Sequence, residues 1–271
     1  MDKILLQIED EELKRQFELH KNDPQVRSFV IDHEIRRNTG NWAQYTNGNY
    51  FVEINKKDGT KIRTTLEDDF KAEFPENIDI KITNWCDMAC PFCHENSNPE
   101  GKHADLFSSA QPTKGNYSEK LFNSLVPGTE LALGGGKVTS HPHLEELLHF
   151  LKRRGIFANI TVHERELKAN KERIQRWLDE DLVKGVGVSI TRAVMDETLE
   201  FAKKNNTVVL HTIAGIMNFE DYKNIASKDL KILILGYKDF RRGHTFLESQ
   251  NSIIKTGIES IKNHERNVEY V

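Results

Sequence analysis

Hydrophobic and polar residues follow one regular pattern from about residue 76 onward, in which short apolar runs alternate with longer amphipathic segments. Short apolar runs predict buried strands, and apolar residues at helical spacing predict helices that pack by one face. The predicted strands are 78–83, 130–133, 158–162, 185–190, 208–213 and 230–235. The predicted helices are 118–125, 142–154, 168–180, 193–205, 219–226 and 252–266.

This alternation predicts the fold class. A repeated strand–helix–strand order produces a parallel sheet joined by right-handed crossovers. Six strands are too few for a closed eight-stranded barrel, so we expect an α/β fold in the form of a curved, open, partial (β/α)6 barrel. A doubly wound open sheet would show the same alternation, and the pattern leaves both architectures open.

Residues 1–75 follow a different pattern and predict an N-terminal extension. Apolar residues at roughly helical spacing predict a helix over 3–20. The polar, glycine-containing stretch 38–49 predicts a loop. The strand-like runs 50–54 and 61–65 flank Asp58-Gly59, and this turn signal predicts a β-hairpin. We therefore expect two regions, a helix and hairpin extension over 1–75 and a barrel with a C-terminal helix over 76–271.

Composition narrows the class of protein. Of the 271 residues, 37% are hydrophobic and 30% are charged, which suits one hydrated domain with a core. The net charge of −4 argues against general nucleic-acid binding. No apolar run approaches the roughly 18 residues of a membrane span. The first ten residues turn acidic too soon for a secretory signal, so the sequence predicts a cytoplasmic protein.

All three cysteines lie within eight positions, as Cys86, Cys90 and Cys93. An odd, clustered set makes a poor disulfide framework, and a reducing compartment would leave the thiols available for metal. The spacing C-x3-C-x2-C suits a [4Fe–4S] cluster, in which three cysteines leave one of four irons open. Zinc usually takes four protein ligands, so a zinc site would need His94 or His103 as well.

The segment 81–93 resembles the signature of the radical S-adenosylmethionine (SAM) superfamily, C-x3-C-x-aromatic-C, with Phe92 at the aromatic position. The resemblance covers about residues 76–240. It implies a cluster reduced by a low-potential donor such as flavodoxin or ferredoxin. It also implies reductive cleavage of SAM to a 5′-deoxyadenosyl radical, which abstracts hydrogen from a substrate. The resemblance leaves the substrate unidentified, with a small molecule, a nucleotide and a peptide as the open alternatives.

A glycine-rich segment after the second strand extends the resemblance. Gly135, Gly136, His141, Pro142 and Leu144 match the family's Thr-Gly-Gly-Glu-Pro-Leu-Leu-His-Pro-Asp-Leu pattern. In the family this edge of the sheet binds the amino group of SAM. The family's Glu is Lys137 here, and an ammonium cannot accept a hydrogen bond from that amino group.

The resemblance also implies roles for residues at the other strand ends, and for each an ordinary structural role stays open. The implied cofactor contacts are Phe92, Gly134, Gly135, Gly136, Ser189, Arg192, Ile213, Gly236 and Tyr237. The candidate substrate contacts are Lys137, His163, Lys238 and Arg241.

No cysteine remains outside the motif, which argues against a second cysteine-ligated cluster and against mechanisms that need a further catalytic cysteine. Two alternatives to the main hypothesis stay open. One is a non-catalytic zinc-binding module, which the Lys137 departure motivates. The other is a glycyl-radical activase with a large protein partner.

Overall fold

Two units make up the chain, Met1–Phe74 and Pro75–Val271, and a six-stranded parallel sheet organises the second. The structure is a computed structural model, and it describes residues 11–57, 59–108, 116–191 and 193–265. Within these ranges, no helix combines the length and the apolarity that a bilayer crossing requires.

The strands of the sheet lie side by side in their order along the chain. They are β4 (Asn77–Thr83), β7 (Glu130–Gly135), β8 (Phe157–His163), β9 (Gly185–Ser189), β10 (Val208–Ile213) and β11 (Ile232–Leu235). A doubly wound sheet reverses its strand order part-way across, and this sheet does not. Among the described strands, none pairs β4 with β11, so the sheet is open and the predicted partial barrel is confirmed.

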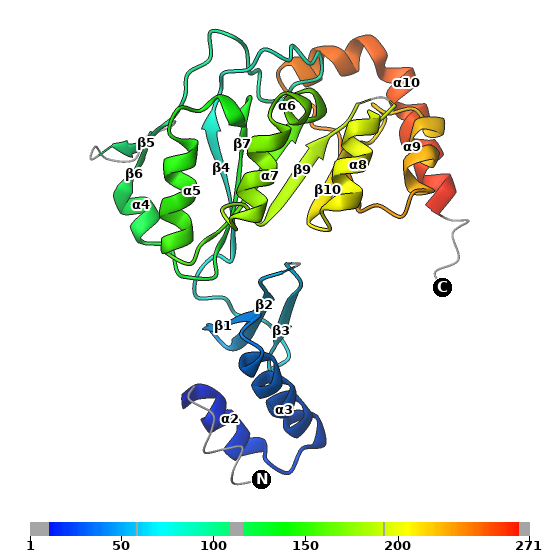
Figure 1. The fold of residues 1–271 in the computed structure, drawn as a ribbon. Coiled ribbons are helices and arrows are strands. Elements are labelled where there is room, and N and C mark those ends of the chain that lie inside the picture. Colours follow the sequence, from blue (N-terminus) through cyan, green and yellow to red (C-terminus); the bar gives the residue numbers. More distant parts are fainter. Residues whose placement is uncertain (1–10, 58, 109–115, 192, 266–271) are drawn as a thin grey trace. The chain divides into compact units, whose positions relative to one another are not determined.

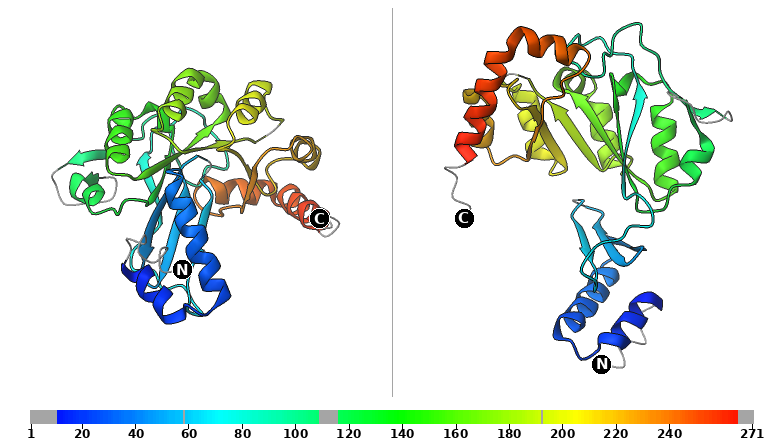
Figure 2. Two further views of the ribbon diagram at one scale, coloured as in Figure 1. Left: turned by 60° about the horizontal axis from the view of Figure 1, so that its bottom comes forward. Right: turned by 180° about the vertical axis from the view of Figure 1, so that it is seen from behind.

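Helices follow the strands and lie along one face of the sheet, as sequential right-handed crossovers require (Figures 1 and 2). They are α4 (Glu119–Asn123), α5 (Leu144–Arg153), α6 (Glu164–Ala169), α7 (Lys171–Asp179), α8 (Asp196–Lys204) and α9 (Phe219–Ala226), with a 3-10 turn η1 (Val138–Ser140). The last helix, α10 (Arg242–Glu265), lies on the other side of the sheet from α5, α7 and α8 (Figure 2).

Two helix predictions were wrong in extent. The helix predicted over 168–180 is two helices, which meet at Asn170. The last helix begins at Arg242, ten residues before its predicted start, and is kinked at Gln250.

Burial alternates along the strands, which shows how the core is built. In β8, Ala158, Ile160 and Val162 are buried, whereas the residues between them are partly exposed. The buried face packs against apolar side chains of the helices, among them Leu147, Leu148, Ile174, Trp177 and Phe201. The opposite, concave face is polar and accessible, which is the arrangement of a partial barrel with its crossover helices on the outside.

A short strand pair, β5 (Asp105–Ser108) and β6 (Asn116–Ser118), joins β4 to α4 and was not predicted. The pair is parallel and forms its own two-stranded sheet.

The described part of the first unit, from residue 11 on, holds two helices and a three-stranded antiparallel sheet. Its elements are α2 (Glu11–His20), α3 (Pro24–Asn38), β1 (Trp42–Asn47), β2 (Tyr50–Asn55) and β3 (Lys61–Thr64). The pairing of β2 with β3 confirms the predicted hairpin. Of the predicted helix 3–20, residues 3–10 lie outside the described ranges.

The loop predicted over 38–49 was wrong, because β1 occupies half of it and α3 extends to its first residue, Asn38. Asn47 is fully buried, donates hydrogen bonds to the Tyr50 hydroxyl (3.0 Å) and the Phe74 carbonyl (2.9 Å), and accepts from the Glu73 amide (2.9 Å). Hydrogen bonding offsets the cost of burying this amide, so polarity was a misleading guide here.

A buried carboxylate on β2 makes the first unit sensitive to acid. Glu53 is 1% exposed and accepts hydrogen bonds from Arg36 and from Gln44 (2.6 Å), with His33 Nδ1 3.1 Å away. Burial alone would raise the pKa of Glu53, but hydrogen bonds from His33, Arg36 and Gln44 together lower it to about 2. The folded unit therefore favours the ionised form.

We expect this group to contribute about 3 kcal/mol of stability above its unfolded pKa, because the pKa is lowered on folding. That contribution is lost as pH falls from about 4.5 toward 2, through the folded pKa. Hydrogen exchange of the β1 and β2 amides in the full chain should show a loss of protection over this window. The variant Glu53→Gln should lose less hydrogen-exchange protection over the same pH window. An equal loss of protection in the variant would contradict the role of Glu53.

Candidate functional site

The three cysteines follow the carboxyl end of β4. The Cys86 amide donates to the Asn98 carbonyl (3.0 Å), and the Cys93 amide donates to the Cys90 carbonyl (3.2 Å). Between the first two cysteines, Ala89 has a φ of 51°, in the left-handed region that residues with a Cβ seldom adopt. These contacts fold residues 84–98, called the cysteine loop below, back on itself at the strand end. All three cysteines are free and partly exposed.

The thiols lie close enough to influence one another. Burial raises the pKa of Cys86 and of Cys90, and the Cys93 thiolate raises both further. A cation bound among them would favour the thiolates, since metal coordination deprotonates thiols. The donor set, three thiols in one loop after a strand end, is of the chemical type that iron–sulfur clusters use.

The glycine-rich segment packs against the cysteine loop. A Cβ on Gly136 would lie 2.1 Å from the Trp85 carbonyl oxygen, and one on Gly135, whose φ is +115°, would lie 2.2 Å from that of Thr83. The Gly136 amide donates to the Thr83 carbonyl (2.8 Å). These glycines thus let β7 approach the backbone that leads to Cys86, whereas Gly134 faces open space.

Lys137 points toward the cysteine loop. Its ammonium lies 2.8 Å from the Asp87 carboxylate and 5.5 Å from the centroid of the Trp85 ring. The side chain of Lys137 therefore has an acidic and an aromatic partner beside Cys86.

The segment 238–243 also holds the cysteine loop. Arg241 donates to the Glu95 carbonyl (3.0 Å), Arg242 donates to the Ser97 carbonyl, and Lys238 Nζ lies 3.3 Å from His94 Nε2. Lys238 and Arg241 are candidate substrate contacts by sequence, and in the structure the side chains of both contact this loop. The start of α10 consequently crosses the carboxyl edge of the sheet (Figure 1).

A cavity of about 860 Å³ opens at the carboxyl ends of the strands, beside the cysteine loop. It is lined by Met88, Ala89, Cys90, Pro91, Phe92, His163, Glu164, Arg165, Thr191, Ala193, Met195, Ile216, Asn218, Asp221 and Phe246. Active sites of parallel barrels lie at this edge of the sheet. This cavity is therefore the candidate functional site.

Three of the residues singled out from sequence line the cavity, namely Cys90, Phe92 and His163. Phe92 packs edge-on against Phe246, with ring centroids 5.8 Å apart. The residues that do not line it are Cys86, Cys93, Gly134, Gly135, Gly136, Lys137, Ser189, Ile213, Gly236, Tyr237, Lys238 and Arg241. Arg192 lies outside the described residues.

The His163 side chain caps a helix and also lines the cavity. Its Nδ1 accepts a hydrogen bond from the Arg165 amide (3.1 Å) and so caps α6. Burial, aided by the Arg165 charge, lowers the pKa of His163. A neutral ring that accepts at Nδ1 carries its proton on Nε2, which makes His163 a hydrogen-bond donor.

Sequence reasoning missed most of the residues that line the cavity. Glu164 and Arg165 lie two and three residues after the predicted strand 158–162, so their place after a strand end was the available signal. Asn218 and Phe246 carried no such signal, because Asn218 caps α9 and Phe246 lies in α10, and neither directly follows a predicted strand.

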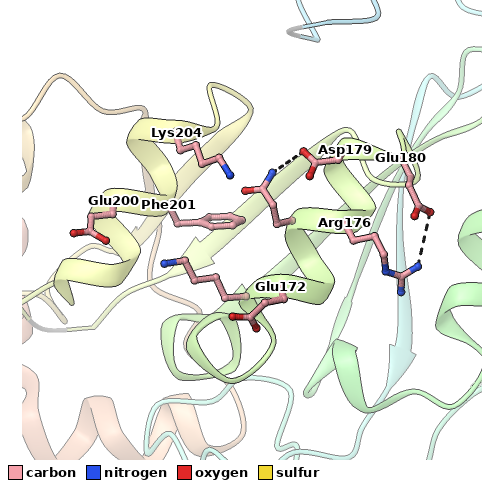
Figure 3. A pocket seen from close by; sticks show the side chains of 9 residues that line it. Glu172, Arg176, Asp179, Glu180, Glu200, Phe201 and Lys204 are labelled. Atoms are coloured by element: carbon pink, nitrogen blue, oxygen red, sulfur yellow. Dashed lines mark hydrogen bonds and ion pairs between the residues drawn. The ribbon is translucent and has the colours of Figure 1, made fainter.

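A second hollow, of about 590 Å³, lies between α7 and α8. Figure 3 shows Phe201 of α8 pointing toward α7, where Gln175 donates to Asp179 (2.8 Å). Apart from Phe201 and Gln175, the residues that line this hollow are charged. None of the residues singled out from sequence lines it.

Within the described ranges, no three His, Cys, Asp or Glu side chains converge on a position for one metal ion. The two histidines considered as a fourth zinc ligand each have another partner. His94 Nε2 lies near Lys238, and His103 Nδ1 lies 2.8 Å from the Thr83 hydroxyl.

Comparisons with known proteins gave matches among solved structures alone. No family model matches the chain, and no curated protein matches it. Streptococcus suis SuiB bound to S-adenosylmethionine shares 12% identity at a TM-score of 0.44, over 83% of this chain and 69% of that one. SuiB bound to precursor peptide SuiA shares 12% identity at a TM-score of 0.43, over 83% of this chain and 70% of that one. TYW1 with a lysine–pyruvate adduct gives 15% and 0.36, over 77% of this chain and 80% of that one. Function is therefore inferred from the site itself.

Proposed function

We propose that this chain is a radical SAM enzyme, in which Cys86, Cys90 and Cys93 hold a [4Fe–4S] cluster. One observation carries the proposal: the C-x3-C-x2-C spacing directly follows β4, and Cys90 and Phe92 form one wall of the cavity at the strand ends. Three thiolates leave one iron of such a cluster without a protein ligand.

When bound, the cluster supplies the electron that cleaves SAM to methionine and a 5′-deoxyadenosyl radical, which abstracts hydrogen from the substrate. The protein's part is to position and shield the reactants. Phe92 offers an aromatic face to the SAM adenine, and His163 offers a donor N–H in the same cavity. The segment 238–243 keeps the cysteine loop in place through its bonds to backbone carbonyls.

The substrate is a small molecule, a nucleotide or a peptide, and a low-potential flavodoxin or ferredoxin supplies the electron. The cavity of about 860 Å³ is large enough for a ligand of drug size, which typically fills about 300–1,000 Å³. The remaining cofactor contacts that the resemblance implies, such as Ser189 and Tyr237, belong to this proposal as well.

Reductive cleavage of SAM tests the proposal. Protein reconstituted anaerobically with iron and sulfide, then treated with dithionite and SAM, should release 5′-deoxyadenosine. Omission of dithionite should stop the release, because the cleavage consumes an electron. An intact, reduced cluster that releases no 5′-deoxyadenosine would refute the proposal.

A further inference from the structure

Lys137 leaves one part of the proposed SAM site without an acceptor. The resembled family has a glutamate at this position, beside the SAM amino group. Here the Lys137 ammonium is bound to Asp87 at 2.8 Å, next to the Trp85 ring. An amino group at the cluster still needs hydrogen-bond acceptors, since a buried donor without a partner costs free energy.

Glu164 is a buried carboxyl group in the wall of the cavity. It is 5% exposed and follows His163 at the end of β8, on the strand next to β7. Among the described residues, only the Met195 amide donates a hydrogen bond to it, at 3.2 Å to Oε2. A carboxylate has about four acceptor positions on its two oxygens, so most of this capacity is unused.

The environment of Glu164 suits a ligand with positive charge or N–H donors. Burial raises its pKa, whereas the Met195 amide and the Arg165 charge act in the opposite direction. A donor group in the cavity would offset the cost of burying the carboxylate. Arg165, which also lines the cavity, lies beside it and offers a cation to a ligand carboxylate.

The other carboxylates near the cavity already accept hydrogen bonds from protein groups. Glu166 is 1% exposed and accepts from the Thr139 and His163 amides. Asp221 accepts a hydrogen bond from the Asn218 side chain at 2.6 Å and lies at the exposed side. Glu164 is therefore the buried carboxylate of the cavity with the most unused acceptor capacity among the described residues.

We infer that Glu164 accepts a hydrogen bond from the α-amino group of SAM, in place of the acidic residue that Lys137 replaces. This inference rests on the proposed function, because it requires SAM in the cavity. It assigns Glu164 a binding role toward the amino-acid end of the ligand and none toward the adenosine end.

The test compares two ligands that differ in the amino-acid end. SAM carries the α-amino group, whereas 5′-methylthioadenosine lacks the amino-acid part and keeps the adenosine. Calorimetric titration of the anaerobically reconstituted full chain, with no substrate present, should show that Glu164→Gln weakens SAM binding about 10- to 100-fold. The affinity for 5′-methylthioadenosine should stay unchanged.

Glu197→Gln is the matched control, because it removes a carboxylate of α8 that is exposed and paired with Lys168 at 2.8 Å, outside the cavity. Iron content and the thermal transition of each variant show that the fold and cluster are retained. An unchanged SAM affinity in Glu164→Gln, or an equal loss for both ligands, would overturn the inference.

The same titration separates this inference from the proposed function. Wild-type protein that cleaves SAM, with a Glu164→Gln variant that binds SAM equally well, would overturn the role of Glu164 alone. Wild-type protein that holds the cluster and binds no SAM would overturn both.

Discussion

Replacing Cys90 with alanine should abolish cluster binding and the release of 5′-deoxyadenosine. Cys90 stands between the other two cysteines in the motif and lines the cavity, and its loss leaves two thiolates. Two sulfur ligands cannot hold a cubane cluster that three support in this proposal. Wild-type protein reconstituted anaerobically should contain about four irons and four sulfides per chain, and the variant close to none.

Glu100→Gln provides the control for Cys90→Ala. Glu100 is exposed and lies just after the cysteine loop, so its change alters charge near the motif without touching a sulfur. The control should keep full iron content. Stoichiometric zinc without iron in the wild-type protein, or full iron in Cys90→Ala, would contradict the cluster assignment and favour the zinc-binding module.

Replacing Glu166 with alanine should lower the free energy of unfolding by about 2–4 kcal/mol. The carboxylate accepts from the Thr139 amide at 2.8 Å and from the His163 amide at 3.4 Å. Alanine would leave both amides without this acceptor and open a cavity in the core. Urea unfolding at constant slope measures the difference.

Glu166→Gln separates the hydrogen bonds from the charge. Glutamine keeps one carbonyl oxygen as an acceptor. The free energy of unfolding should therefore fall less in Glu166→Gln than in Glu166→Ala. Burial raises the pKa of Glu166, so removal of the charge itself should cost little. A loss as large in Glu166→Gln as in Glu166→Ala would show that the carboxylate is needed for its charge.

The sheet could be predicted from sequence because its strands are short apolar runs between helical segments, and β8 and β10 bury every second residue. All six predicted strands exist, with ends shifted by two residues at most. The strand order could not be read from periodicity, since an open barrel and a doubly wound sheet share the same alternation. The strand β1 was missed because Asn47 is polar and buried, and only its tertiary hydrogen bonds explain that.

The cysteine motif could be found by spacing, whereas the rest of the site could not. Lys238 and Arg241 were candidate substrate contacts by sequence, whereas in the structure their side chains contact the cysteine loop. The sequence predicted no role for Glu164, because its burial and its place in the cavity wall depend on tertiary packing. A sequence gives the residue types at a strand end, and tertiary packing decides which of them face the ligand.

The most direct test of the central claim is electron paramagnetic resonance of the dithionite-reduced protein, before and after SAM is added. Our account predicts the signal of a reduced [4Fe–4S] cluster, and a change in that signal with SAM, because SAM binds the iron that lacks a protein ligand. A reduced cluster whose spectrum is the same with saturating SAM, or protein without a cluster signal, would contradict it.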